Sequence, residues 1–117
     1  MKDDRLYLTH IEECIEYIQE YIVEGEDVFF SDRKTQDAVL RNLHTLSESV
    51  QRLSRSLKTR HPDVDWRTIA AFRNVVVHDY LGIDLDRIWD IVQDDLPDLK
   101  RSVETILAEL SGQENSH

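Results

Sequence analysis

TQDAVLRNLHTLSESVQRLSRSLKTR, residues 35–60, contains no glycine or proline and repeats its apolar residues at steps of four and three. This spacing places them on one face of an α-helix. We therefore predict an amphipathic helix of about seven turns over residues 35–60. His-Pro-Asp at 61–63 is expected to end it, because a proline disfavours helical backbone in the residue before it. The apolar face comprises Val39, Leu43, Leu46, Val50, Leu53 and Leu57.

The same spacing of apolar residues predicts helices on both sides of this segment. Residues 5–24 form a helix whose other face is rich in glutamate, and Gly25 is its expected end. Residues 26–34 are expected to be a connection in which Phe29 and Phe30 pack against the bundle.

Three helices are predicted after the break at 61–63, over residues 66–79, 85–94 and 97–112. The first is expected to be capped by Asp63 or Asp65 and to end at Gly82. Asp84 is the expected cap of the second. The third is expected to begin with Pro97 and to end at Gly112. The fold class is therefore all-α, an antiparallel bundle of four main helices plus a short extra helix. We expect a single domain over residues 1–112 and a frayed tail over 113–117.

Composition restricts the class of protein. The 117 residues are 40% hydrophobic and 32% charged, with only three glycines and two prolines, which excludes disordered and collagen-like chains. Cys14 is the single cysteine, so neither an internal disulfide nor a cysteine-based zinc cluster is available. No apolar run approaches the length of a membrane span, and the N-terminus is polar. We expect a cytoplasmic protein that does not enter the membrane.

The charge is unevenly distributed. The formal net charge is -10, which argues against a general nucleic-acid coat, yet residues 31–60 carry seven basic and three acidic residues. This basic segment is either a solvated helix face or a local anion-binding patch, and the charges alone do not decide between the two. Its centre consists of Arg52, Arg55, Lys58 and Arg60.

One stretch combines side chains suited to chemistry on a phosphate, namely AFRNVVVHDY at residues 71–80. Arg73 has a permanent charge and a planar group that binds phosphate through two hydrogen bonds. His78 titrates near neutral pH and can transfer a proton, and Asn74 shares its helix face. Together they suit metal-independent attack of an RNA 2′-hydroxyl on the neighbouring phosphate. The alternative is structural: a capping histidine, a salt-bridged arginine and a packed Tyr80.

Motifs for a metal site, a phosphate-binding loop and a serine or cysteine nucleophile are not found, and we expect no cofactor or metal.

RNVVVHDY resembles the signature of the HEPN-domain ribonucleases: Arg, four residues, His, any residue, Tyr, with Asn after the Arg. The resemblance is closest to the HepT-like toxins and covers about residues 5–110. It includes TQDAVLRNLHTLSESV before the motif and the stretch from His-Pro at 61–62 to a tryptophan-containing helix after it. One departure is Leu-Ser-Glu-Ser at 46–49, where relatives often have Ile-Gly-Glu-Ala.

The resemblance implies a helical homodimer, or a larger assembly, whose two motifs face each other across a cleft. It implies a metal-independent RNA endonuclease of a type VII toxin–antitoxin system. The cognate antitoxin would be an MntA-like nucleotidyltransferase that transfers AMP to the motif tyrosine.

The resemblance also assigns roles to individual residues. Arg73 would bind the scissile phosphate, His78 would be the acid/base, Asn74 would orient the site, and Tyr80 would accept AMP. Glu48 is a weaker candidate that would pair with Arg73. Separately from the resemblance, the charge of the basic segment suggests the hypothesis that Arg52, Arg55 and Lys58 guide RNA to the cleft.

Two other functions remain open. One is a non-catalytic HEPN module that binds nucleotides or a nucleotidyltransferase. The other is a plain helical dimerisation domain.

Overall fold

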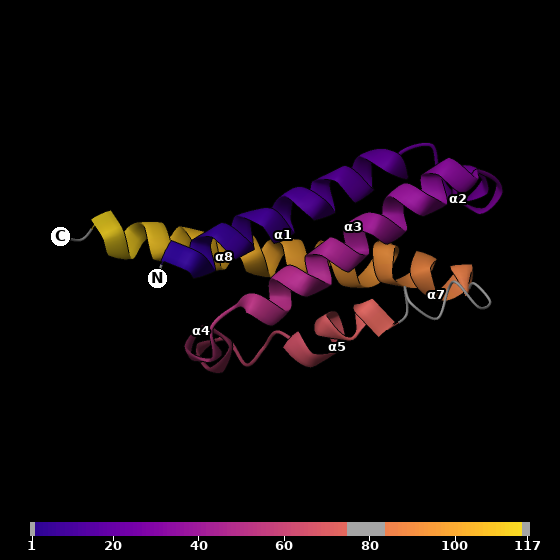
Figure 1. Cartoon of the computed structure of the whole chain (residues 1–117). Helices are drawn as coiled ribbons and strands as arrows, with labels where there is room; N and C mark the ends of the chain where they lie inside the picture. Colours follow the sequence, from indigo (N-terminus) through magenta and orange to yellow (C-terminus); the bar gives the residue numbers. More distant parts are fainter. Residues whose placement is uncertain (1, 75–83, 116–117) are drawn as a thin grey trace.

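The computed structural model describes residues 2–74 and 84–115, and these form a bundle of helices with no strand among them (Figure 1). Three long helices build its frame: α1 (Lys2–Tyr21), α3 (Arg33–Arg52) and α8 (Leu96–Asn115). α1 packs against both α3 and α8. The predicted all-α bundle is confirmed.

The core consists of the apolar faces that the sequence predicts. All six apolar residues of the stretch 35–60 are buried, as are Leu8, Ile11, Ile15 and Ile18 of α1. Leu99, Val103 and Ile106 supply the face of α8, while Leu107 and Leu110 are only partly buried. Burial of a large aliphatic side chain contributes about 1.5–3 kcal/mol, so these faces hold the three long helices together.

Residues 26–31, predicted as part of a connection, instead form the short helix α2 (Glu26–Ser31). Gly25 precedes it at a φ of 99°, a left-handed backbone angle that favours glycine. Phe29 is fully buried, with its ring centroid 5.1 Å from that of Trp89, and Phe30 meets the same indole at 6.1 Å. The expected packing of the two phenylalanines is therefore confirmed, and it joins α2 to α7 (Leu85–Asp90).

The single helix predicted over residues 35–60 is wrong, because the chain breaks between α3 and α4 (Arg55–Arg60). Leu53 and Ser54 adopt extended backbone there. The Ser54 hydroxyl caps α4 by accepting a hydrogen bond from the Leu57 amide at 3.1 Å. Asp4 of α1 accepts hydrogen bonds from the Ser54 amide at 2.8 Å and its hydroxyl at 2.6 Å. The break thus follows from a contact fifty residues away.

The helix predicted to start at Trp66 begins there as α5 (Trp66–Ala70). Ala71 forms a turn and residues 72–74 are helical again. The rest of the predicted 66–79 helix, and its predicted end at Gly82, lie outside the described residues.

The break predicted before Pro97 is also wrong, because α7, a π-helical turn η1 (Ile91–Asp95) and α8 follow one another without interruption. A proline inside an α-helix lacks an amide donor, and its ring clashes with the carbonyl four residues earlier. The wider π-turn directly before Pro97 accommodates this. α8 also continues past Gly112, the predicted end, to Asn115.

Candidate functional site

Arg73 and Asn74 are the last described residues before position 75; they are helical, as is Phe72, and both are exposed. Phe72, directly before them, is 1% exposed and anchors the segment in the core. The Asn74 amide donates a hydrogen bond to the Ala71 carbonyl at 2.9 Å, which closes the turn between α5 and this segment. Within the described ranges no carboxylate forms an ion pair with Arg73.

The start of α5 is fixed by side-chain hydrogen bonds. Asp65 accepts from the Thr68 amide at 3.2 Å and the Thr68 hydroxyl at 2.6 Å, and these bonds lower the pKa of the carboxyl. The Trp66 indole donates to the His61 carbonyl at 3.0 Å and ties the start of α5 to the preceding segment. Of the two predicted caps, Asp65 is therefore the one that the structure uses. A fixed α5 sets the direction in which Arg73 leaves the bundle.

Glu48 forms an ion pair with His44, and its predicted pairing with Arg73 stays a prediction. Its carboxylate lies 2.5 Å from the His44 imidazole, one turn earlier on α3. Both side chains are more than a third exposed, so this pair stabilises the helix only slightly. Next to it, Ser47 is fully buried and donates a hydrogen bond to the His44 carbonyl at 2.8 Å. That bond satisfies the hydroxyl of a buried side chain.

His78 and Tyr80 lie outside the described residues. Their roles as acid/base and AMP acceptor therefore stay predictions, as does the role of Asn74. The structure places the arginine of the motif on exposed helical backbone.

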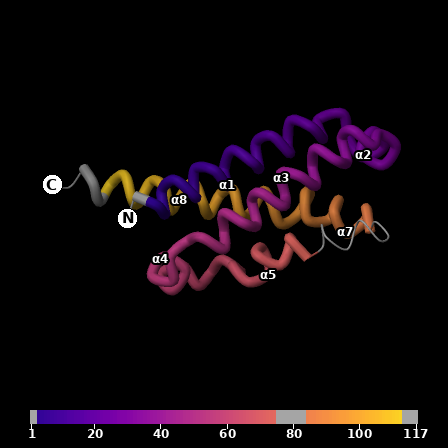
Figure 2. Tube along the Cα trace, viewed as in Figure 1, coloured from indigo at the N-terminus to yellow at the C-terminus, as the bar shows by residue number. Residues whose placement is uncertain are grey.

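The basic segment does not lie along one helix. Arg52 ends α3, Arg55 begins α4, and both are exposed. Lys58 is half-buried, and burial lowers its pKa while the nearby Asp4 carboxylate opposes that shift. α5 leads away from α4 toward α7 (Figure 2), and Arg73 follows α5 in the sequence. A role of this patch in guiding RNA stays a prediction.

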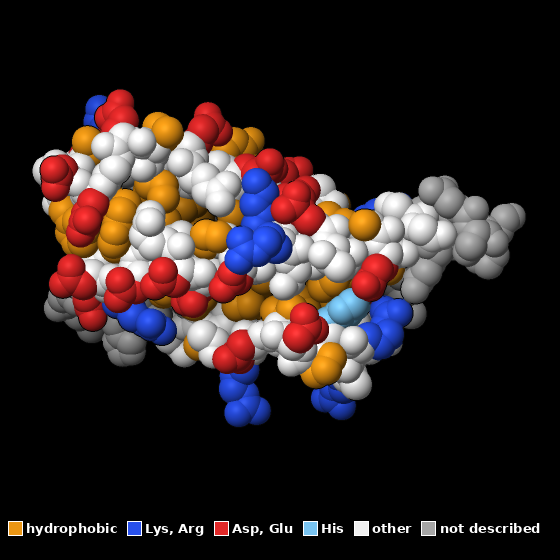
Figure 3. All heavy atoms as spheres, turned by 180° about the vertical axis from the view of Figure 1, so that it is seen from behind, with side chains coloured by type: hydrophobic (Ala, Val, Ile, Leu, Met, Phe, Trp, Pro, Cys, Tyr) orange, Lys and Arg blue, Asp and Glu red, His pale blue; other side chains and the backbone are white. Residues whose placement is uncertain are grey.

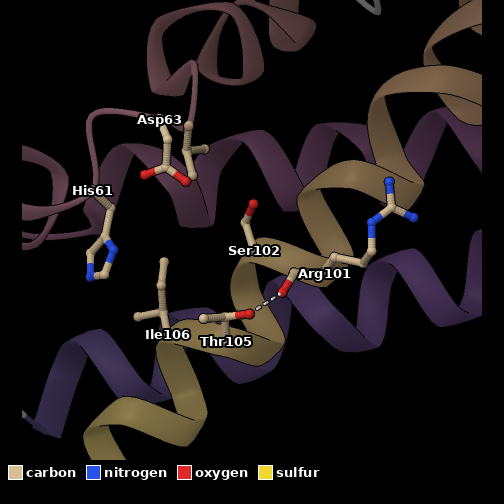
Figure 4. A pocket seen from close by; sticks show the side chains of 7 residues that line it. His61, Asp63, Arg101, Ser102, Thr105 and Ile106 are labelled. Carbon is tan, nitrogen blue, oxygen red and sulfur yellow. Dashed lines mark hydrogen bonds between the residues drawn. The ribbon is translucent and has the colours of Figure 1, made fainter.

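Two adjoining hollows separate residues 61–72 from η1 and α8, and sequence reasoning did not find them. Their volumes are about 160 and 240 Å³, and both are lined by Asp63, Val64 and Ser102. His61 and Asp63 face Ser102, Thr105 and Ile106 of α8 across the smaller hollow, while the Arg101 side chain points away from it (Figure 4). Residues this far apart in sequence give no local signal of a shared cavity.

Across residues 2–74 and 84–115, no helix is both long and apolar enough to cross a membrane. The same ranges contain no group of three or more His, Cys, Asp or Glu side chains arranged to hold a metal ion.

Comparison with known proteins identifies the family. The family model described as "Ribonuclease HepT-like" matches residues 11–106. The "Probable ribonuclease HepT" of Thermococcus cleftensis is 38% identical over 102 residues, which are 86% of this chain and 92% of that protein. The "Gamma-glutamylcyclotransferase and putative RNase MJ0434" of Methanocaldococcus jannaschii is 34% identical over 116 residues. These are 98% of this chain, which spans only about half (52%) of the M. jannaschii protein.

No solved structure matches the chain significantly. The family match covers α3, α4, α5 and the arginine of the motif, and it extends well into α8. The predicted resemblance is confirmed, and the chain belongs to the HepT-like ribonuclease family.

Proposed function

We propose that this chain is a metal-independent RNA endonuclease, the toxin of a toxin–antitoxin pair, with Arg73 as its phosphate-binding residue. The observation that supports this most directly is the exposed Arg73, which has no carboxylate partner within the described ranges, in a chain of a ribonuclease family.

The proposed reaction uses the nucleophile that RNA itself carries. His78 removes the proton from the 2′-hydroxyl, the oxygen forms a bond to phosphorus, and the bond from phosphorus to the 5′-oxygen breaks. The leaving oxygen takes a proton, for which the facing motif of a second copy offers another histidine. Arg73 binds the non-bridging oxygens and stabilises the negative charge that develops on them.

Control by AMP transfer follows from the same chemistry. We propose that an MntA-like nucleotidyltransferase adds AMP to Tyr80, two residues after His78. The added phosphate brings negative charge and bulk close to Arg73, where it competes with the substrate phosphate. Replacement of Tyr80 by phenylalanine should leave cleavage intact and abolish the gain of AMP in the intact mass.

The test is RNA cleavage in EDTA by protein made without any nucleotidyltransferase, with its intact mass confirming an unmodified Tyr80. We expect wild type to cleave, and His78→Ala to lose about 10²–10⁴-fold in rate, the usual contribution of a general acid or base. Arg73→Ala should lose a comparable factor, and Arg73→Lys should recover only part because an ammonium cannot bind two oxygens in one plane.

A matched control is Arg67→Ala, which removes an exposed arginine from α5 one turn or more before the motif. It should cleave like wild type. Failure of folded, unmodified wild type to cut several classes of RNA would favour the non-catalytic HEPN module instead. Full activity of both His78→Ala and Arg73→Ala would remove the proposed site.

A further inference from the structure

Two tyrosines lie exposed on the outer side of α1, close to its C-terminal end. Tyr17 is 50% exposed and Tyr21 is 39% exposed. Their rings stack, with centroids 6.5 Å apart and planes 17° from parallel. We call Tyr17 and Tyr21 the tyrosine pair. Leu6 and Val23 are the other large apolar side chains that are exposed in the described ranges, and neither is aromatic.

The bundle itself gives the tyrosine pair no partner beyond this stacking. Residues four apart share one side of a helix, and the opposite side of α1 is held in the core by the fully buried Ile15 and Ile18. α1 packs against α3 and α8 through that buried side. The tyrosine pair is therefore an aromatic surface that the packing of the helices leaves uncovered, and such surfaces typically mark protein contacts.

The surroundings of the tyrosine pair are acidic. Residues 6–32 contain eight aspartates and glutamates and no lysine or arginine. Glu13 lies four residues before Tyr17 and Glu20 three residues after it, so both border its ring on the helix surface. Both are exposed, and among the described residues neither forms an ion pair. Acidic side chains predominate over the face of the molecule in Figure 3, with apolar side chains exposed between them.

This combination matches the chemistry of an arginine side chain. A guanidinium is planar and positively charged, so it can stack on an aromatic ring and at the same time donate hydrogen bonds to a carboxylate. The tyrosine pair offers the ring, and Glu13 and Glu20 offer carboxylates on two sides of it. The same carboxylates repel a phosphate, so neither RNA nor an anionic lipid surface fits here.

We propose that the tyrosine pair, with Glu13 and Glu20 beside it, is a docking site for an arginine-containing segment of another protein. Charge complementarity selects this occupant, because a segment with several arginines neutralises carboxylates that have no cation of their own. The proposal does not rest on cleavage of RNA. Figure 1 shows α1 and α5 on opposite sides of α3, and Arg73 follows α5, so docking and cleavage are measured separately.

The test uses the full chain and a synthetic probe, the capped peptide Arg-Gly-Arg-Gly-Arg-Gly, at about 0.15 M salt. NMR follows the ring resonances of Tyr17 and Tyr21, which the variants Tyr17→Phe and Tyr21→Phe assign. The peptide should shift both sets of resonances saturably. A matched peptide with citrulline in place of arginine has the same shape without the charge, and it should leave them unshifted.

Variants then separate the aromatic contribution from the charge. Tyr17→Phe keeps the ring face and should bind like wild type. Tyr17→Leu should weaken binding about two- to fivefold, and the double variant with Tyr21→Leu about tenfold. Glu20→Gln should also weaken it about two- to fivefold. The matched controls are Leu6→Ala and Asp3→Asn, exposed residues at the other end of α1, and both should bind like wild type.

Thermal unfolding by circular dichroism checks that each variant is folded, and the single Tyr17→Leu variant decides if the double variant is not. The proposal is overturned if the arginine peptide shifts neither ring or if the citrulline peptide binds equally well. An equal loss in Asp3→Asn and Glu20→Gln also overturns it, because the peptide then responds to net charge alone. So does a change in the sedimentation of the double variant without peptide, since the tyrosine pair is then a contact between copies of this chain.

Discussion

Replacing Asp4 by alanine should destabilise the protein by about 3 kcal/mol, an effect that its position near the N-terminus does not suggest. The Asp4 side chain is 3% exposed and accepts two hydrogen bonds from Ser54. A hydrogen bond to a charged group contributes about 1.5–3 kcal/mol, and two bonds on one carboxylate add less than fully. Alanine also leaves the partly buried Ser54 amide without its acceptor.

Urea unfolding followed by circular dichroism at fixed protein concentration measures this cost. With an m-value of about 1.5 kcal/mol/M, the midpoint should fall by about 2 M. Asp4→Asn should cost about half as much, because its amide oxygen still accepts one bond. Ser54→Ala should cost about 1–2 kcal/mol, and the double variant should cost less than the sum of the two.

Asp3→Ala is the control, since Asp3 is the exposed neighbour in the same helical turn. It should change the free energy of unfolding by less than about 0.5 kcal/mol. If Asp4→Ala were no worse than Asp3→Ala, the contact between α1 and α4 would not hold the break in the helix, and the reasoning would be refuted.

Two further predictions concern groups with shifted pKa values. Burial, and then the nearby Glu16 and Glu104, raise the pKa of Glu12, while Lys100 opposes this shift. The folded state therefore binds a proton on Glu12 more tightly than the unfolded state does. The stability that this proton contributes is present at low pH and is lost as pH rises through the folded-state pKa. Glu12→Gln should therefore raise the urea midpoint at pH 7, and this increase over wild type should shrink as pH falls through the acidic range. An equal increase in the midpoint at pH 4 and at pH 7 would contradict this. Burial, and to a lesser extent Glu13, raise the pKa of Cys14 from 9.0 to about 11, so at pH 8 its thiolate fraction is about 100-fold below that of an ordinary thiol. A disulfide reagent should react at least that much more slowly with Cys14 in the native protein than in urea, and equal rates would show that the thiol is accessible.

Local sequence was a good guide to which residues are helical and a poor guide to where helices are interrupted. The heptad-like spacing at residues 39–57 correctly predicted six buried side chains, yet it runs straight through the break at Leu53 and Ser54. The apolar residues keep their phase across that break, so no local pattern reveals it. Pro97 wrongly predicted an interruption, because the π-turn before it lets the helix continue. A proline makes helical backbone locally unfavourable, but the geometry of the neighbouring turns decides whether the helix ends there.

The candidate site divides in the same way. The motif at residues 73–80 was identified from sequence alone. An arginine that can bind phosphate and a histidine that can transfer a proton stand within one short stretch, which is a local property of the sequence. Glu48 pairs with His44, one turn earlier on the same helix, whereas the predicted pairing with Arg73 depends on how separate segments pack.

The sequence by itself determined the helical fold class, the buried faces and the family, because periodicity and a local motif are properties of the order of residues. Only the tertiary structure decided that Asp4 of α1 binds Ser54 where the long helix breaks, and that Arg73 is exposed. It also formed the two hollows from residues of separate segments, 61–72 on one side and η1 and α8 on the other. These features depend on contacts between residues distant in sequence, and such contacts exist only once the helices have packed.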